Sequence, residues 1–285
     1  MEPKQKIFWI ASYPKSGNTL ARLVLQAAIQ GKVDVNQLGD ICPSWHGYVR
    51  YRMSRYETIS NSRLEVGEER KYWDNLQREF LLDNKFQSGH PKYKFLKIHH
   101  ALLRVSGQLT INPELSGGIL YLVRNPIDVA KSLSEFDGVP IRESAINMVN
   151  SDFVAAGDRD QIRHGVELRS DWATHVTSWT QHSLTVPTLI IRYEDFMINP
   201  IKAIEEILQV TETISLKTTS EIAELTSFAN VKNQEQQHGF NEAGLGPTFF
   251  AKARVGSLAS GFIKKLFLPK FGTVISKYDY QPYFR

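Results

Sequence analysis

The segment Ile7–Leu25 constrains the fold of this chain more than any other stretch. It opens with the short apolar run Ile7–Ile10, rich in β-formers and cut off at Pro14 and Gly17, which predicts a buried strand. From Thr19 onward the apolar residues recur at helical spacing. The chain is therefore expected to begin with a strand, a turn and a helix, as an α/β unit does.

The turn in this segment has the chemistry of an anion-binding loop. Lys15, Ser16 and Thr19 supply donors, and the unpaired amides and dipole of a helix N-terminus attract negative charge. Gly17 would let the backbone approach a ligand closely. A plain strand–helix connection with a solvated lysine would have the same pattern. The loop is not a Walker motif, because that motif places its lysine after the second glycine, whereas Lys15 precedes the only glycine here.

A second strand end followed by a helix lies in the middle of the chain. The apolar run Gly118–Val123 predicts a buried strand that leads into Arg124. Pro126 is favoured in the first turn of a helix, so a helix is expected to start there and to carry Ser132 two turns later. Taken alone, this pattern could also be a helix cap beside a surface arginine.

These two elements resemble those of the sulfotransferase family, which uses 3′-phosphoadenosine 5′-phosphosulfate (PAPS) as its sulfuryl donor. The sequence SYPKSGNT is similar to the family's 5′-phosphosulfate loop, and Arg124 and Ser132 have the family's spacing for holding the 3′-phosphate. The resemblance extends from Ile7 to Gly256 and is nearest to bacterial enzymes that modify natural products. It implies donor contacts from the loop residues Lys15, Ser16, Gly17, Asn18, Thr19 and Leu20.

A pair of histidines follows the next predicted strand. Tyr93–Ile98 alternates in polarity and ends at His99 and His100, and ligands of open α/β sheets bind outside the carboxyl ends of strands. Histidines at strand ends are also often only hydrogen-bonded within the structure. The family carries K-x-H here, which implies that His99 is the general base and Lys97 a catalytic helper. Since successive strand side chains face opposite sides, His100 is expected to face away from the donor.

Further donor contacts are implied in the C-terminal half. The segment Arg192–Asp195 resembles one in which the tyrosine, here Tyr193, lies near the adenine. On the residues alone, a tyrosine at a strand end could equally brace the next helix. The segment Thr226–Phe228 resembles the one that covers the adenine, which implies a contact from Phe228.

The chain departs from the family pattern at two positions. Arg254 and Gly256 stand where relatives have R-K-G to bind the 3′-phosphate, but Val255 replaces the lysine. One phosphate contact is therefore expected to be missing or to come from elsewhere, for instance from Lys252. Leu20 stands where many relatives have a tryptophan that stacks on the adenine, so aromatic stacking is not expected there.

Length and composition favour one α/β domain over residues 1–285. A chain of 285 residues with 42% hydrophobic content can bury a large core, and no linker or repeat divides it. The expected fold has three layers, with helices on both faces of a central, mainly parallel sheet. Helices are expected over 141–154 and 167–184, the latter with core tryptophans. Regions 31–92 and 157–165 are expected to be acceptor-side insertions, and the aromatic residues of the first either line a pocket or pack the insertion onto the domain.

Charge and cysteine content narrow the partners. The net charge of +4 suits an anionic cofactor without the dense basic stripe of a nucleic-acid-binding protein. The single cysteine, Cys42, forms no intrachain disulfide, and no acidic cluster has metal-ligand spacing, so no metal is expected. No apolar run approaches the ~18 residues of a membrane span, and the start does not resemble a signal peptide. We expect a cytoplasmic protein and leave a homodimer open.

The implied reaction is sulfuryl transfer from PAPS to the hydroxyl of a small-molecule or natural-product acceptor. Neutral His99 would take the hydroxyl proton, while Lys15 and Lys97 stabilise the charge on the leaving oxygen. A nucleotide kinase shares the strand–loop–helix unit but requires a different glycine–lysine order. A relative that binds the nucleotide without chemistry is the third alternative, because function resides in sites and not in folds.

Overall fold

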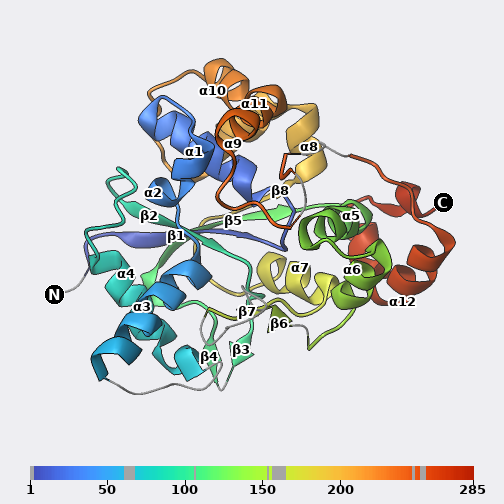
Figure 1. The fold of residues 1–285 in the computed structure, drawn as a ribbon, viewed down its shortest axis with the longest axis horizontal. Coiled ribbons are helices and arrows are strands. Elements are labelled where there is room, and N and C mark those ends of the chain that lie inside the picture. Colours follow the sequence, from blue (N-terminus) through green and yellow to red (C-terminus); the bar gives the residue numbers. More distant parts are fainter. Residues whose placement is uncertain are drawn as a thin grey trace.

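The computed structural model describes residues 3–60, 68–105, 107–152, 154–155, 165–245, 248–250 and 255–285. Its centre is a parallel four-stranded sheet in the order β2–β1–β5–β8 (Figure 1). The strands are β1 Lys6–Ser12, β2 Tyr93–Ile98, β5 Ser116–Val123 and β8 Thr188–Arg192. The three strands predicted at Ile7–Ile10, Tyr93–Ile98 and Gly118–Val123 are thus confirmed, and the sheet is parallel as expected.

Strand β1 lies in the interior of the sheet and is buried on both faces. Trp9 pairs with Leu96 of β2 on one side and Ile119 of β5 on the other. A strand covered on both faces is apolar throughout, which explains the continuous run Ile7–Ile10. Because the four strands are parallel, their carboxyl ends meet at one edge of the sheet.

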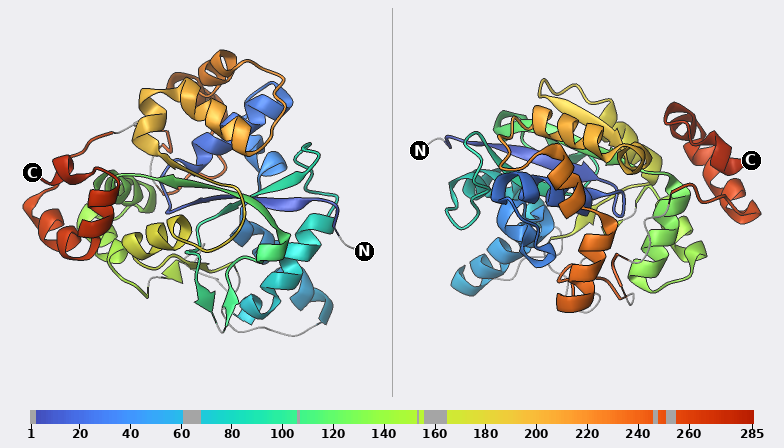
Figure 2. Two further views of the ribbon diagram at one scale, coloured as in Figure 1. Left: turned by 180° about the vertical axis from the view of Figure 1, so that it is seen from behind. Right: turned by 90° about the horizontal axis from the view of Figure 1, so that it is seen from above.

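Two helical layers cover the sheet, and the side chains of β1 alternate between them. Phe8 and Ile10 belong to a core shared with α1 Asn18–Gln30, α9 Pro200–Val210 and α10 Thr219–Leu225. Ile7 and Trp9 face the opposite core, which includes α3 Trp45–Ser60, α4 Trp73–Leu82, α7 Trp172–Thr180 and α12 Gly261–Lys277. This period of two is that of a strand between two layers. Figure 2 shows the helices that cover the two faces of the sheet. The three-layer α/β architecture is as predicted.

The remaining elements connect these layers. The helices are α2 Leu38–Ile41, α5 Pro126–Asp137, α6 Ile141–Met148, α8 Tyr193–Ile198 and α11 Phe228–His238. Two short antiparallel pairs join β3 Arg104–Val105 to β4 Gln108–Leu109 and β6 Val154–Ala155 to β7 Glu167–Leu168. The 3-10 turns are η1 Val35–Gln37, η2 Glu68–Tyr72, η3 Pro113–Leu115 and η4 Gln281–Phe284.

Two predicted helices are shorter than expected. The helix expected over 141–154 ends at Met148, and the one expected over 167–184 is α7 alone. Residues Glu167–Leu168 pair instead with β6. The side chain of Asp171 then starts α7 by accepting a hydrogen bond from the Thr174 amide at 2.9 Å. Within the described ranges, no helix is both long and apolar enough to cross a membrane.

Candidate active site

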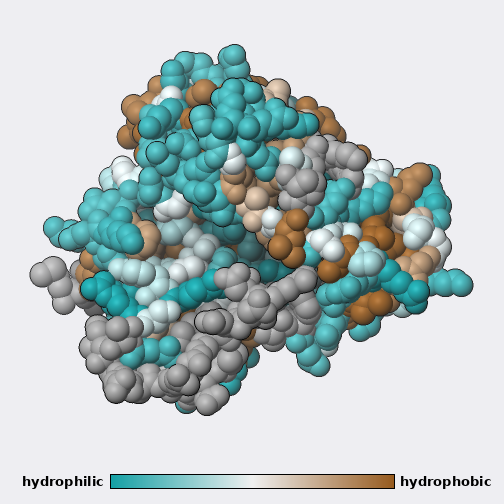
Figure 3. Space-filling model, viewed as in Figure 1, coloured by the Kyte–Doolittle hydropathy of each residue, from teal (hydrophilic) through white to brown (hydrophobic). Residues whose placement is uncertain are grey.

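A cavity of about 890 Å³ lies at the carboxyl edge of the sheet. Its walls come from the β1–α1 turn, the ends of β2 and β5, and helices α3, α5, α6, α8 and α11. Figure 3 shows the face of the molecule hollowed near its centre. This edge is where open parallel sheets bind their ligands, so the cavity is the candidate active site.

The β1–α1 turn wraps closely around the N-terminus of α1. Lys15 and Gly17 both have left-handed backbone, with φ of 66° and 105°. A Cβ atom on Gly17 would lie 2.8 Å from a ring carbon of Tyr193, so only glycine fits this position. Among the described residues no side chain caps α1, which leaves its first amides available to a ligand.

A buried hydroxyl also marks this turn. Ser16 is fully buried, and its Oγ has no hydrogen-bond partner among the described residues. Asn18 holds the turn against the strand, since its Nδ2 donates to the Ile10 carbonyl at 2.8 Å. An unpaired buried donor costs free energy unless something supplies an acceptor. Ser16 is not among the described residues that line the cavity, although its neighbours Lys15 and Gly17 are, so its hydroxyl lies beneath the cavity surface.

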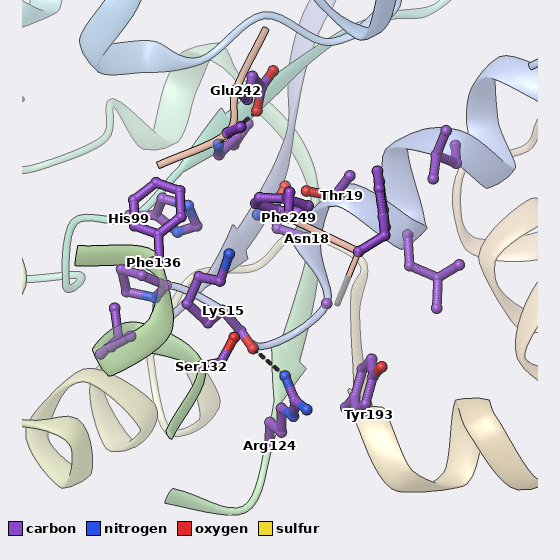
Figure 4. Close-up of a pocket in the computed structure, with 18 of the residues that line it drawn as sticks. Lys15, Asn18, Thr19, His99, Arg124, Ser132, Phe136, Tyr193, Glu242 and Phe249 are labelled. Atoms are coloured by element: carbon purple, nitrogen blue, oxygen red, sulfur yellow. Dashed lines mark hydrogen bonds and ion pairs between the residues drawn. The ribbon is translucent and has the colours of Figure 1, made fainter. Parts of the chain in front are cut away.

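The Lys15 ammonium group lies between two aromatic rings (Figure 4). Its Nζ is 3.6 Å from the ring centroid of Phe249 and 4.3 Å from that of Phe136. Burial, together with repulsion from Lys97 and Arg124, lowers the pKa of Lys15 to about 7. Such clustered positive charge favours an anionic ligand, which would restore the charged form of Lys15.

The second predicted phosphate element meets the first at this edge. Arg124 follows β5 and donates from Nη1 to the Lys15 carbonyl at 2.7 Å (Figure 4). Its guanidinium carbon lies 4.2 Å from the ring centroid of Tyr193. Ser132, two turns along α5, lines the same cavity. The structure thus brings together both segments that the sequence singled out.

His99 has one ring nitrogen fixed by the backbone. Its Nδ1 lies 2.7 Å from the Ser12 carbonyl oxygen, which can only accept, so Nδ1 carries the proton. The Nε2 atom then has a lone pair, and the residue lines the cavity. Burial and the nearby Lys97 charge hold the pKa of His99 well below its usual value. Both effects favour the neutral form of the His99 imidazole.

His100 has a separate environment. Its Nδ1 accepts a hydrogen bond from the Leu168 amide at 2.8 Å, and its ring centroid lies 4.8 Å from the ring centroid of Trp73. Burial lowers the pKa of His100 to about 4. The described residues lining the cavity include His99 and not His100. The two histidines thus face different surroundings, as expected at the end of a strand.

Comparison with known proteins identifies the family. The family model of the sulfotransferase domain matches residues 5–257. This chain belongs to the sulfotransferase family. "Sulfotransferase 1A1" of Canis lupus familiaris is 30% identical over 116 residues, a match that covers 40% of this chain and 37% of the relative's length.

Solved structures share the fold of this sulfotransferase. A retinol dehydratase in complex with retinol and PAP has a TM-score of 0.53 at 16% identity, over 99% of this chain and 81% of the other. Mouse sulfotransferase SULT7A1 complexed with PAP has a TM-score of 0.56 at 19% identity, over 98% and 89% of the two chains. At these identities the likeness concerns the fold.

Glu242 joins two parts of the site that the sequence did not connect. Its carboxylate receives both terminal nitrogens of Arg22 at 2.8 Å and lies 3.2 Å from the Lys97 ammonium nitrogen. Although burial opposes it, these cations hold the pKa of Glu242 well below its usual value. Arg22 is itself buried and donates to the Cys42 carbonyl. An arginine among the apolar residues of α1 was the only sequence signal of this network.

Glu167 is a second residue that the sequence does not single out, because a helix is predicted over 167–184. Its carboxylate lies 3.0 Å from His46 Nδ1 and accepts hydrogen bonds from Arg169 at 2.8 and 2.6 Å. All three residues line the cavity. Against the effect of burial, Arg169 and His46 hold the pKa of Glu167 well below its usual value.

The other predicted donor residues divide between the cavity and its surroundings. Asn18, Thr19, Leu20, Tyr193 and Phe228 line the cavity. Gly256 is not among its described lining residues, and its amide donates to Asp128 at 3.0 Å instead. Its predicted phosphate contact therefore has no support from this geometry. Arg254 and Lys252 lie outside the described residues.

Proposed function

We propose that this sulfotransferase transfers a sulfuryl group from PAPS to an acceptor hydroxyl, with His99 as the general base. The observation that carries the proposal is the 2.7 Å contact between His99 Nδ1 and the Ser12 carbonyl, which leaves Nε2 with a lone pair. This base lines the same cavity as the anion-binding turn. A base beside a phosphate-type site is what transfer to a hydroxyl requires.

The residues at the donor end fit PAPS. The open amides of α1 and the unpaired Ser16 hydroxyl suit its phosphosulfate end, together with Lys15. Arg124 and Ser132 would hold the 3′-phosphate, and Tyr193 and Phe228 would lie near the base. The relatives solved with PAP support this choice of nucleotide.

The proposed chemistry divides between His99 and the two lysines Lys15 and Lys97. PAPS supplies an activated sulfuryl group when bound. His99 takes the proton from the acceptor hydroxyl as the new S–O bond forms, and the S–O bond to the nucleotide breaks. Lys15 offers a positive charge to the departing oxygen, and Lys97 adds to the potential on this side of the cavity.

The acceptor and the cellular setting complete the proposal. Relatives were solved with retinol and androsterone, which supports a small-molecule hydroxyl acceptor. Residues 1–285 form one domain in this proposal, with 31–92 contributing to the acceptor side. The lone cysteine, Cys42, suits a reducing compartment such as the cytoplasm.

The test is a donor-and-acceptor assay on the purified chain. Radiolabelled PAPS is incubated with hydroxylated compounds, and both PAP release and labelled product are measured. We expect labelled product without added divalent metal. Binding of PAP with no product from any acceptor would favour a non-catalytic relative, and phosphoryl transfer from ATP with magnesium would favour a kinase.

A further inference from the structure

The sides of the cavity differ in polarity, and the rings of Phe136 and Phe249 line it beside Lys15. Helices α8 to α11 and their connections supply mostly apolar lining residues, among them Phe196, Met197, Ala223 and Val231. The opposite side, which we call the acceptor wall, consists of residues from α3 and β7 and from positions next to them. Its described members are all polar: Ser44, His46, Arg50, Glu167 and Arg169.

The acceptor wall adjoins the general base. Ser44 forms a β-bridge with Lys97, two residues before His99. Leu168, which lies between Glu167 and Arg169, donates from its amide to His100 Nδ1 at 2.8 Å, and its carbonyl accepts from the Ala101 amide at 2.8 Å. These bonds hold β7 beside the chain that carries His99. A hydroxyl placed at His99 Nε2 would therefore belong to a molecule whose neighbouring groups meet this wall.

Three aromatic residues of the 31–92 insertion pack into the core and are not among the described residues that line the cavity. Trp45, Tyr48 and Trp73 are buried and belong to the core on that face of the sheet. Trp45 packs against Trp9, with ring centroids 6.3 Å apart. Of the two roles that the sequence left open for these three aromatics, packing is the one they have.

Glu167 gives the wall a fixed hydrogen-bond acceptor. Its side chain is only 7% exposed, and His46 and Arg169 hold both carboxylate oxygens in place. A carboxylate can accept about four hydrogen bonds, and the described residues supply three. The described residues therefore leave one position, which a donor on a ligand can occupy.

Building on the function proposed above, we infer that the acceptor is a polyhydroxylated, sugar-like molecule. One hydroxyl meets His99, and a neighbouring hydroxyl donates to Glu167. A lipophilic alcohol would displace water from these ion-paired groups without replacing its hydrogen bonds, which is unfavourable. The hydroxyls of a polyol replace the hydrogen bonds that the displaced water made.

The first test compares matched acceptors on the wild-type enzyme. Sugars and cyclitols are assayed beside their deoxy analogues, which lack one neighbouring hydroxyl, and beside retinol and androsterone. We expect kcat/KM to favour the complete polyol by about 10- to 100-fold, as for a hydrogen bond to a charged group. Preference for the lipophilic alcohols, or turnover of no polyol, would overturn the inference.

The second test changes Glu167 alone. Glu167→Gln should reduce the preference for polyol over deoxy analogue about tenfold, while PAP affinity stays unchanged. Glu114→Gln is the matched control, because that side chain is 84% exposed and contacts Arg78 instead. An unchanged preference in Glu167→Gln contradicts the inference.

The two proposals fail in different ways. If the wild-type protein does not bind PAP, the proposed sulfotransferase reaction itself is contradicted. Sulfation of lipophilic alcohols with normal PAP binding would leave the reaction standing and remove only the polyol. If Glu167→Gln does not fold, the wild-type acceptor pairs still decide the question.

Discussion

The donor end and the acceptor wall of one cavity are built in different ways. The donor end comes from two contiguous segments, Lys15–Leu20 and Arg124–Ser132, and each is a strand end followed by a helix. The acceptor wall joins α3 to β7, which lie far apart in the sequence. A helix N-terminus is encoded locally, whereas an ion-paired wall exists only after the chain has folded.

The two regions also differ in charge. At the donor end, Lys15 contacts aromatic rings and is repelled by Lys97 and Arg124. In the acceptor wall, the charge of Arg169 is met by Glu167. The first arrangement favours an anion, and the second favours a polar ligand of low net charge. The predictions below test the base beside the acceptor wall and then the charges of the donor end.

The largest expected effect separates the adjacent histidines. His99→Ala should lower kcat by about 10²- to 10⁴-fold, because it removes the base, while PAP affinity remains. His100→Ala should keep most of kcat but should lower the free energy of unfolding by about 1–3 kcal/mol, because the Leu168 amide loses its acceptor. Steady-state kinetics and denaturant unfolding measure the two quantities.

The reverse pattern would break the assignment of the base. If His100→Ala lost as much turnover as His99→Ala while remaining folded, His100 would have to position His99 or the acceptor. Equal kinetics for His99→Ala and wild type would remove His99 from the mechanism.

A smaller effect should follow at the 3′-phosphate. Arg124→Ala should weaken PAP binding by about 10- to 100-fold, since it removes a charge-assisted contact. Binding of adenosine 5′-phosphate, which lacks the 3′ group, should change much less. Calorimetric titration of both nucleotides gives the ratio.

Arg104→Ala is the control for this change. Arg104 lies on β3, is exposed, and donates to the Gly107 carbonyl, so its loss should leave both nucleotides unaffected. Equal losses for the two nucleotides in Arg124→Ala would instead indicate that Arg124 acts by holding the Lys15 loop through the Lys15 carbonyl.

The effect expected to be smallest near neutral pH is a pH dependence of donor binding. With a free-state pKa of about 7, Lys15 is increasingly neutral above that pH, whereas the anion-bound state requires it charged. Binding then takes up a proton, so PAP affinity should be steady below about pH 7 and should fall above it by up to tenfold per pH unit. Titrations between about pH 6 and about pH 9 measure the slope.

Lys15→Arg supplies the reference for that slope. Arginine stays protonated throughout this range, so the fall in affinity above neutral pH should flatten. Identical slopes for the variant and wild type would attribute the pH dependence to another group, the ligand's own phosphates included.

Local patterns were sufficient for the frame and for the donor end. The apolar runs Ile7–Ile10 and Gly118–Val123 and the alternating segment Tyr93–Ile98 predicted strands. The parallel sheet brings the carboxyl ends of these three strands to one edge. Strand alternation also anticipated the separate surroundings of His99 and His100. These features depend on residues near one another in the chain, which is why a sequence displays them.

Only the tertiary structure shows which distant residues contact the charged groups of the site. Glu242 reaches Arg22 and Lys97, and Glu167 reaches His46, across separations that no local pattern records. The hydrogen bond from the Gly256 amide to Asp128 likewise joins residues that lie far apart in the sequence. A strand or a helix start is specified by neighbouring residues, but the partner of a buried charge is chosen by which distant segments the folded core brings within hydrogen-bonding distance.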